Sequence, residues 1–424
     1  MAPMVAASDY AFRRLVRSYS PVDDRGHVLG YTQMLHAKKL VHDKTFLRNH
    51  LDFCDWDGEL LPTQLACIEG NAEEVHQGAG LHHEGGPLMV QLAGHCPSTV
   101  SDAAQLLIER APTCISGFDL NLGCPQGIAR KGRYGAFLME QDEDLVCQIL
   151  TQMRRSLPSH IMVSAKIRLP LDGDVALKRR IAKLMDTGMD FMTIHGRNLK
   201  ENKVTVGVCH FDKIRLAVDF AHSIRPGFPV IANGGIENHE SIATVMDRTG
   251  ACAVMSSEAL LETPNIFSVP SPEDSRALLN QQLKFARDYI EICSQHPPLP
   301  GAFSPNGGSF NVARGHLFKF LHRYVQVHDD LRTKMTDTMP WNLKSASLLI
   351  DELESRYQSD ADLEQFCGPS WYLRHRAGRD LIHHRGPKDA MPEVPLDERK
   401  RQMQERIQLL RNQNDGKNQQ VTVA

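Results

Sequence analysis

Residues 88–122, LMVQLAGHCPSTVSDAAQLLIERAPTCISGFDLNL, contain one full repeat of the pattern that decides the fold. Two short apolar runs, Leu88–Ala93 and Gly117–Leu122, flank the stretch Asp102–Arg110, whose apolar residues recur with helical spacing. Runs that are apolar on both faces are typical of strands in a parallel sheet that is covered by helices. The repeat therefore predicts a strand, a helix and a second strand parallel to the first.

Similar apolar runs occur on both sides of this repeat. We expect eight strands, at Ala2–Ala6, Val28–Leu35, Leu88–Ala93, Gly117–Leu122, Ile161–Ile167, Phe191–His195, Pro229–Ala232 and Ala251–Met255. Eight strand–helix units in roughly 250 residues are typical of an α/β protein with a TIM, or (β/α)8, barrel. The alternative is a doubly wound open sheet, but no G-x-G-x-x-G motif follows the first run.

The pattern changes after Pro264. Three later stretches have helical periodicity and predict a small all-helical C-terminal domain: Ser271–Gln295, Val312–His328 and Ser345–Tyr357. The predicted division is 1–265 for the barrel, 270–358 for the helical domain and 359–424 for a basic, partly disordered tail. Residues 54–86 do not fit the barrel rhythm, and we expect them to form a surface insertion.

Composition excludes several classes of protein. The 424 residues are 42% hydrophobic and 23% charged, with a net charge of −3, which is ordinary for a globular chain. No apolar run reaches about 18 residues, so no transmembrane helix is predicted. The ten cysteines form no CxxC pair, which argues against zinc and iron–sulfur sites. A nucleic-acid partner would have to be held by local basic patches.

The predicted compartment follows from the cysteines and the N-terminus. Several cysteines lie inside apolar runs, where a reduced thiol behaves as a small hydrophobic group. The first residues lack the basic-then-apolar order of a secretory signal. We therefore expect a reducing compartment, the cytoplasm, with the nucleus as a second location.

Function in a TIM barrel lies at the carboxyl ends of the strands. The predicted strand ends carry Met4, Gln91, Asn121, Lys166, His195, Asn233 and Ser256. Gln91 or Asn121 alone could cap a helix, and His195 alone could be a loop histidine. Lys166 lies within the apolar run VSAKIRL, where burying an ammonium is costly unless an anion meets it.

The segments NGGI and SSEA follow the seventh and eighth runs. Glycine-rich and serine-rich backbone at these places commonly holds a phosphate in TIM barrels. Together with Lys166, Gln91 and His195, these segments suggest a phosphorylated cofactor with an electron-rich ring, and flavin mononucleotide (FMN) fits that description.

The most specific stretch is Asp119–Met139, DLNLGCPQGIARKGRYGAFLM. Gly123 permits a sharp turn after the strand, which exposes Cys124 on a loop that Pro125 stiffens. Such a cysteine could be a nucleophile, a metal ligand, an acid or simply a packed loop thiol. No companion ligands lie nearby in the sequence, which disfavours a metal.

Seven motifs in order, APMV, VQLAG, DLNLGCPQ with YGAFLM, AKIRL, TIHGR, ANGGI and VMSSEAL, resemble those of the tRNA-dihydrouridine synthases over roughly residues 1–330. The form CPQ followed by YGAFL is most similar to the eukaryotic branch that acts on uridines 16 and 17 of the tRNA D-loop. The resemblance implies an NAD(P)H-dependent flavin oxidoreductase with FMN as cofactor, NADPH or NADH as reductant and tRNA as partner. We also expect a monomer without a metal or a membrane.

The resemblance assigns roles residue by residue. It implies that Cys124 is catalytic. It implies cofactor contacts at Pro3, Met4, Val5, Gln91, Asn121, Lys166, His195, Asn233, Gly234, Gly235, Ser257 and Glu258. Many members have Gly-Arg in place of Ser257-Glu258, so we expect Glu258 to act through its backbone only. The basic residues assigned to tRNA are Arg130, Lys131, Arg133, Arg197, Arg314, Lys319 and Arg323, although a solvated surface is the simpler explanation for most of them.

The chemistry of uracil suits this set of residues. A hydride adds at C6, negative charge builds over C5 and O4, and a positioned acid protonates C5. A thiol with an ordinary pKa of about 8.5 is mostly protonated at neutral pH, so Cys124 fits the acid, and a strongly lowered pKa would contradict that role. Two alternatives stay open: an FMN barrel acting on a free pyrimidine such as dihydroorotate, and an RNA-binding barrel without chemistry.

Overall fold

The computed structural model describes residues 1–20, 28–53, 86–202, 207–299, 310–336, 342–359 and 370–372. These residues contain one sheet of eight strands: β1 (Gly30–Tyr31), β2 (Leu35–His36), β3 (Leu88–Ala93), β4 (Gly117–Leu122), β5 (Met162–Leu169), β6 (Phe191–Asn198), β7 (Val230–Asn233) and β8 (Ala253–Met255). The order is β1-β3-β4-β5-β6-β7-β8, β2 also pairs with β3, and every pair is parallel. The predicted TIM barrel is confirmed.

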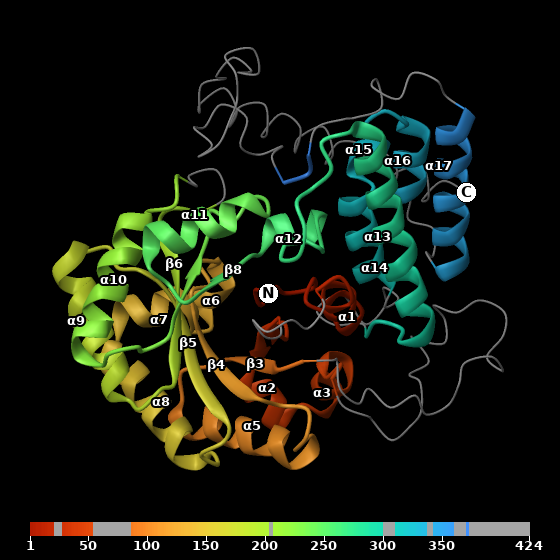
Figure 1. Ribbon diagram of the computed structural model, residues 1–424. Coiled ribbons are helices and arrows are strands. Elements are labelled where there is room, and N and C mark those ends of the chain that lie inside the picture. The colour runs from red at the N-terminus through yellow and green to blue at the C-terminus, as the bar shows by residue number, and fades with distance from the viewer. Residues whose placement is uncertain are drawn as a thin grey trace, which may run out of the picture. The chain divides into compact units, whose positions relative to one another are not determined.

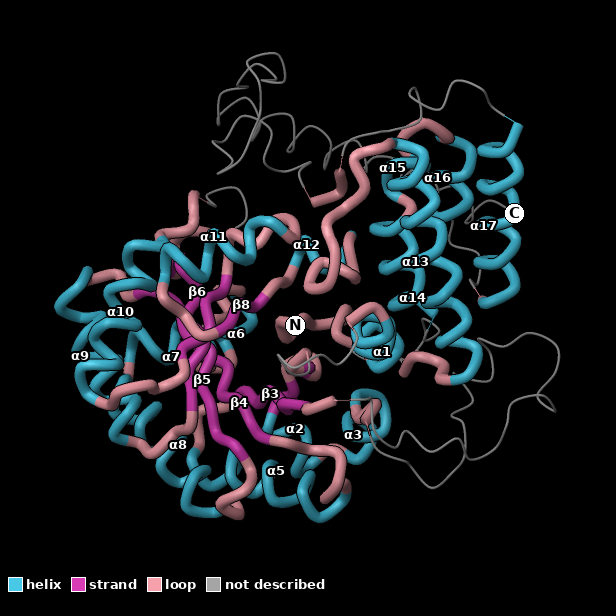
Figure 2. Tube along the Cα trace, viewed as in Figure 1, coloured by secondary structure: helices cyan, strands magenta, loops and turns pink. Residues whose placement is uncertain are grey.

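Helices surround the strands (Figures 1 and 2). The longer ones are α5 (Pro97–Arg110), α8 (Glu143–Ser156), α9 (Gly173–Asp186), α10 (Phe211–Ile224) and α11 (Glu240–Thr249). The shorter ones are α1 (Tyr10–Ser18), α2 (Ala37–His42), α3 (Lys44–His50), α6 (Gly127–Lys131), α7 (Gly135–Gln141) and α12 (Glu258–Glu262). Helix α8 is typical: Asp142 accepts a hydrogen bond from Leu145 N at 3.0 Å, and Val146, Ile149 and Met153 form its buried face.

The expected strand over Ala2–Ala6 is wrong. Met4 O accepts hydrogen bonds from the N–H groups of Ala7 and Ser8, and the Ser8 hydroxyl bonds Met4 N and Ala2 O. A serine side chain thus takes the backbone groups that a strand would use, and the chain turns instead. Ala2 N still donates to Ser256 O (2.9 Å) and Met1 N to Leu29 O (2.9 Å), so these two residues bridge the gap between the two ends of the sheet.

The expected single strand over Val28–Leu35 is also wrong, because it divides into β1 and β2. Thr32 lies between them. Its hydroxyl donates to Gln33 O at 2.8 Å and accepts from Gln91 N at 3.2 Å, so a side chain replaces one carbonyl of the ladder. The strand pairing with β3 resumes at Leu35.

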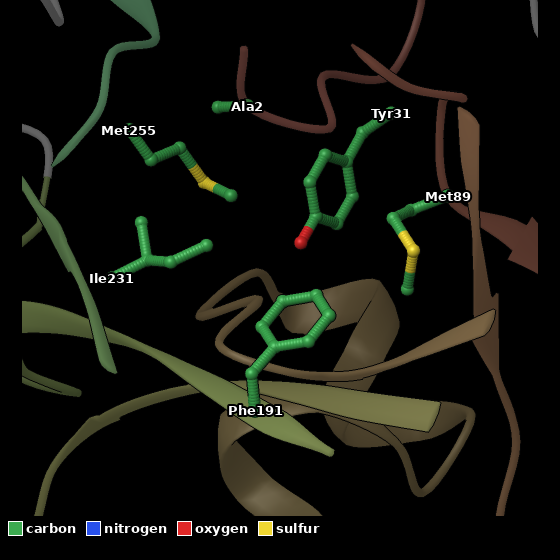
Figure 3. Packing of buried hydrophobic residues seen from close by; sticks show 6 residues of the cluster. All are labelled: Ala2, Tyr31, Met89, Phe191, Ile231 and Met255. Carbon is green, nitrogen blue, oxygen red and sulfur yellow. The ribbon is translucent and has the colours of Figure 1, made fainter. Parts of the chain in front are cut away.

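The interior of the barrel is layered. Figure 3 shows six side chains from separate elements that point toward one another and form a buried cluster: Ala2, Tyr31, Met89, Phe191, Ile231 and Met255. Gly117 leaves room for this cluster, because a Cβ there would lie 2.8 Å from Met89 Cε and 2.5 Å from Met162 O. Residues two apart on a strand face the same side. The positions that follow Met89, Phe191 and Ile231 on the inner face are therefore Gln91, Thr193 and Asn233, which are polar.

Helices follow the barrel, as predicted. They are α13 (Ser275–Gln295), α14 (Phe310–Phe320), α15 (His322–Val325), α16 (Asp329–Thr336) and α17 (Leu343–Ser359). Helix α13 begins four residues later than the predicted Ser271, because Asp274 caps it by accepting from Ala277 N at 2.7 Å. Residues 1–372 form one compact unit, and the predicted division into domains at 265–270 stays a prediction. The predicted insertion lies outside the described residues except for Gly86, as does the tail except for Ser359 and residues 370–372.

Asp9 connects the N-terminal segment to these helices. Its carboxylate caps α1 by accepting from Phe12 N (3.2 Å), and it also accepts from Tyr289 Oη (3.0 Å) and His316 Nε2 (2.7 Å). Burial opposes the charge on Asp9, but the interaction with His316 and these hydrogen bonds lower its pKa overall. Burial lowers the pKa of His316, so we assign a neutral imidazole that donates to an ionised carboxylate.

Candidate functional site

The polar residues predicted at the strand ends lie on the inner face of the barrel. Gln91, Lys166 and His195 lie within β3, β5 and β6, and β5 and β6 continue beyond the predicted ends to Leu169 and Asn198. The strand register places Asn121 beside Lys166 and His195 beside Asn233. The sheet therefore brings these residues together, as the sequence predicted.

A chain of hydrogen bonds crosses from β5 to the loop after β4. Ser164 Oγ donates to Asp119 Oδ1 (2.7 Å), and Gln91 Nε2 donates to Asp119 Oδ2 (2.8 Å). Asn121 Nδ2 then donates to Gln91 Oε1 (2.7 Å), and Cys124 N donates to Asn121 Oδ1 (3.1 Å). Burial raises the pKa of Asp119 to about 6, against the effect of its hydrogen bonds from Gln91 and Ser164, so the carboxyl group is mostly ionised at neutral pH.

Lys166 places a positive charge on the inner face. Its Nζ donates to Asn233 Oδ1 at 2.8 Å, and Asn233 Nδ2 donates to Met255 O at 2.7 Å, so the amide is held at both ends. Burial and then the charge of Arg168 lower the pKa of Lys166 to about 8, while Asp119 opposes this change. The ammonium is thus retained at neutral pH, in surroundings where an anionic ligand would stabilise it.

Two arginines form hydrogen bonds to the loops that follow β4 and β6. Arg168 Nε donates to Gly123 O at 2.7 Å and so ties the cysteine loop to β5. Arg197, which the resemblance assigned to tRNA, is 5% exposed, and its Nε donates to Gly207 O at 2.9 Å. Arg197 Nη1 lies 3.2 Å from His195 Nε2. An arginine can only donate, so Nε2 is the acceptor and His195 carries its proton on Nδ1.

The loop of Cys124 is fixed on both sides. Cys124 N donates to Asn121 Oδ1, and Cys124 O accepts a hydrogen bond from Ala136 N at 3.1 Å. Gly135 has φ +69°, and a Cβ at this position would lie 2.7 Å from Cys124 O. The glycine of the YGAFL motif therefore allows the chain to pass directly beside the cysteine.

The Cys124 thiol is half-buried and packs with Tyr134 and neighbouring apolar side chains. Burial raises its pKa, and this effect outweighs the lowering by the Gln126 N–H and by the charges of Arg168 and Lys166. The sulfur is therefore a protonated thiol at neutral pH. It is suited to donate a proton rather than to attack as a thiolate.

The loop after β7 forms a tight backbone cradle. Gly234 and Gly235 have φ values of +96° and +75°. A Cβ at Gly234 would lie 2.8 Å from His195 Cδ2, and a Cβ at Gly235 would lie 2.6 Å from Phe211 Cζ. Ser256, directly after β8, is 1% exposed, and its hydroxyl has no hydrogen-bond partner among the described residues. Backbone without side chains beside an unsatisfied hydroxyl suits a phosphate.

The remaining residues predicted to contact the cofactor lie in the N-terminal turn and in the segment between β8 and α12. Met4 packs against the buried cluster of Figure 3, and Pro3 and Val5 flank it in the N-terminal turn. Ser257 precedes α12, and the side chain of Glu258 is exposed.

The basic residues predicted to contact tRNA differ in their surroundings. Arg130 and Lys131 end α6, Arg133 follows with a positive φ of 53°, and all three are exposed close in sequence to Cys124. This group forms a cationic surface beside the cysteine loop.

The second basic group lies on the C-terminal helices and is partly buried. Lys319 Nζ donates to Gly315 O at 2.7 Å. Arg323 Nε lies 3.6 Å from Glu262 Oε1, so its charge is opposed by a carboxylate of α12. Arg314 is also partly buried. The side chains of this second group therefore contact other parts of the protein and are only partly exposed to solvent.

Sequence reasoning missed three members of the inner face. Asp119, Ser164 and Arg168 were given no role, although the first lies two residues before Asn121 and the others flank Lys166 at the same spacing. Strand periodicity is the signal that would have found them. No group of three or more potential metal-ligating side chains occurs in the described ranges, and no helix in them is long and apolar enough to cross a membrane.

Comparison with known proteins agrees with this arrangement. Residues 1–351 match the family model described as dihydrouridine synthase. A Saccharomyces cerevisiae protein named tRNA-dihydrouridine(16/17) synthase, NAD(P)+-linked, is 30% identical over 336 residues, which are 79% of this chain and 68% of the relative. A mouse 16/17 synthase-like protein is 31% identical over 371 residues, 86% of this chain and 63% of the relative. A human 20a/20b synthase-like protein is 33% identical over 361 residues, 84% and 90% of the two chains.

The chain thus spans about two thirds of the length of the first two relatives and most of the third. The family match covers the whole barrel and the helices that follow it as far as residue 351, within α17. With its inner polar face and its loop thiol, the chain belongs to the dihydrouridine synthase family.

Proposed function

We propose that the protein reduces uridine to 5,6-dihydrouridine in the D-loop of tRNA, at positions 16 and 17, with FMN as cofactor and NADPH or NADH as reductant. The observation that carries this proposal is the protonated thiol of Cys124, held by Asn121 at the end of a buried polar chain. The names of the yeast and mouse relatives support the substrate, the positions and the nicotinamide. The human relative, named for positions 20a and 20b, makes the site of reduction the point to test.

The residues present fit a flavin nucleotide. The cradle at Gly234 and Gly235 suits its phosphate, as does the Ser256 hydroxyl, which has no partner in the part of the chain that the structure describes. Lys166 offers the cation that an electron-rich ring requires. Gln91 and Asn121 offer amide groups to the ring edge. When bound, the reduced flavin supplies a hydride to C6 of the uracil.

Cys124 supplies the proton. As C6 accepts the hydride, electrons of the C5=C6 bond move toward C5 and O4, and the S–H proton passes to C5. The thiolate left behind is reprotonated from water, which completes the balance. Its stabilisation comes from Lys166 and Arg168, the two cations whose charges act on the sulfur.

The exposed cations Arg130, Lys131 and Arg133 suit the tRNA backbone beside the cysteine. D-loop uridines are poorly stacked, so moving one out of the RNA costs little. The proposed setting is the cytoplasm, with the nucleus as a second location, and the proposed form is a monomer. The apolar setting of several cysteines supports a reducing compartment.

The test compares Cys124→Ala with Cys252→Ala, which removes an exposed thiol at the opposite, amino-terminal end of β8. Cys124→Ala should bind flavin and oxidise NADPH normally, yet form dihydrouridine about 10²–10⁴ times more slowly, as expected for loss of a general acid. Cys252→Ala should match the parent.

Mass spectrometry of tRNA treated with each variant gives both the rate and the position. Normal product from Cys124→Ala would remove this thiol from the mechanism. Product confined to positions 20a and 20b would replace the proposed target, and a parent protein that never binds flavin would refute the proposal as a whole.

A further inference from the structure

We propose that Asp119 is a positioning residue that fixes the orientation of two amide side chains, Gln91 and Asn121, and thereby sets both the cofactor-facing groups and the cysteine loop. The ligand that the amides would bind follows from the proposed function. The orientation of the amides follows from the hydrogen bonds alone.

An amide side chain has two ends of almost equal size and opposite hydrogen-bonding character, so its orientation is decided by its partners. At one end of this chain is Asp119, which is fully buried and, when ionised, can only accept. Its two oxygens take one hydrogen bond each, from Ser164 Oγ at 2.7 Å and from Gln91 Nε2 at 2.8 Å. The Gln91 nitrogen must therefore face Asp119.

The other end is fixed by groups that can only donate. The backbone N–H groups of Gly123 and Cys124 lie 3.3 and 3.1 Å from Asn121 Oδ1. The Asn121 oxygen must therefore face the loop, and its nitrogen faces Gln91 Oε1 at 2.7 Å. Reversing either amide would place two donors or two acceptors against each other at buried positions, which is strongly unfavourable.

The consequence concerns what the site offers to a ligand. Each amide nitrogen has two N–H groups, and within the described residues Gln91 donates only to Asp119 and Asn121 only to Gln91. One N–H of each is left for a ligand, so the inner face presents donors to carbonyl or ring-nitrogen acceptors. Asp119 sets this polarity without touching the ligand, and the same chain ends on the backbone of Cys124.

The test uses two conservative substitutions, Asp119→Asn and Ser164→Ala, alone and together. In Ser164→Ala the carboxylate still accepts only, so Gln91 keeps its orientation. In Asp119→Asn the Ser164 hydroxyl can accept from the new amide nitrogen, which turns the new oxygen toward Gln91. In the double variant Asn at 119 can offer either end to Gln91, so the chain is held from one end only, by the Gly123 and Cys124 N–H groups that donate to Asn121.

The holoenzyme readouts are the dissociation constant of FMN and the visible absorption spectrum of the bound flavin. Each single variant should raise the dissociation constant by at most about twofold, whereas the double variant should raise it at least tenfold and alter the spectrum. A tenfold change corresponds to about 1.4 kcal/mol, of the order of one misdirected hydrogen bond. A packing role would give effects that simply multiply, because Asp and Asn have the same shape. Multiplicative effects with an unchanged spectrum would therefore overturn the inference.

A second measurement separates this inference from the proposed function. Urea unfolding of the flavin-free protein should show the same non-additivity between the two substitutions, since the hydrogen-bond chain exists without the ligand. If the parent binds no flavin, the proposed function fails, and the unfolding cycle still decides the inference: non-additivity upholds it and additivity refutes it.

Discussion

Replacing Lys166 with methionine should make the flavin-free protein more stable at neutral pH while it weakens flavin binding. Methionine keeps the length of the aliphatic stem and removes the ammonium. In the parent that ammonium has one hydrogen bond, to Asn233 Oδ1 at 2.8 Å, and it lies partly buried near the like charge of Arg168. The folded protein therefore holds this charge at a cost when no anion is present.

The magnitude follows from the pKa of Lys166, which burial and Arg168 lower from 10.5 to about 8. Each tenfold change in proton affinity is about 1.4 kcal/mol, so holding the charge costs about 3 kcal/mol. The substitution also leaves Asn233 Oδ1 without a donor, which costs about 1–2 kcal/mol. The net expectation is a variant about 1–2 kcal/mol more stable than the parent at pH 7.

The sign of this difference depends on pH. Below about pH 8 the lysine is charged in both the folded and the unfolded state, so the full cost applies. Between about pH 8 and 10.5 the unfolded state binds more protons than the folded state, so the stability of the parent rises with pH. Once Lys166 is neutral in the folded parent, the two proteins differ in stability only by the hydrogen bond to Asn233 that the variant lacks. The variant should therefore become the less stable protein between about pH 9 and 10.

Urea unfolding of flavin-free protein at pH 7, 8.5 and 10 measures this crossing, and Lys178→Met, at an exposed position on α9, is the matched control. FMN titration of the same samples should show weaker binding by Lys166→Met alone. A Lys166→Met protein that is less stable than the parent at pH 7, by an amount that does not change with pH, would refute the reasoning.

Two further predictions concern the surface and the helical segment. Arg130→Ala with Arg133→Ala should weaken tRNA binding and reduce the slope of log affinity against log salt by about 1.5, with the unfolding free energy unchanged within about 0.5 kcal/mol; an unaltered slope in filter-binding titrations would place the RNA elsewhere. Asp9→Asn should lower the unfolding free energy by about 1.5–3 kcal/mol at pH 7, since the charged acceptor of the hydrogen bonds from Tyr289 and His316 is replaced by a neutral amide with a single acceptor oxygen. The lowered pKa of Asp9 means that this advantage of the parent exists above about pH 4 and disappears as pH falls further, so an equal loss at pH 3 and pH 7 would contradict it.

The sequence was sufficient to predict that four polar side chains meet on the inner face, although not their partners Asp119, Ser164 and Arg168. Parallel strands carry their carboxyl ends to one edge of a sheet, so Gln91, Asn121, Lys166 and Asn233 had to converge once the five consecutive strands β3 to β7 were assigned correctly. The N-terminal segment was not predictable by the same rule. An apolar run at Ala2–Ala6 resembles a strand, and only the position of the Ser8 hydroxyl, which replaces the ladder partners of Met4 and Ala2, shows that the chain turns.

Charge was a weaker guide than strand periodicity. Arg197 and Arg323 are basic residues that were both assigned to tRNA from the sequence. In the folded chain Arg197 bonds His195 and Arg323 faces Glu262, a residue more than sixty positions away. Spacing along one helix or strand cannot show which distant carboxylate or imidazole lies opposite. Arg130 and Arg133 were predicted on the same grounds, and their exposure keeps them as the stronger candidates.

The chemistry of this barrel depends on strand register more than on any single residue. Met89 and Gln91 point inward because they are two apart on β3, and Val90 between them packs on the helix side. A shift of β3 by one residue would turn Gln91 out and leave the buried Asp119 with Ser164 as its remaining donor. The same two-residue spacing places Ser164 and Lys166 on one face of β5. Ser164 therefore lies opposite Asp119 and donates a hydrogen bond to it, and Lys166 lies two residues further along the strand. Pairing the strands in this register therefore produces three features together: the apolar cluster at Met89, the layer of hydrogen-bonded polar side chains next to it, and the Cys124 thiol on the loop after β4.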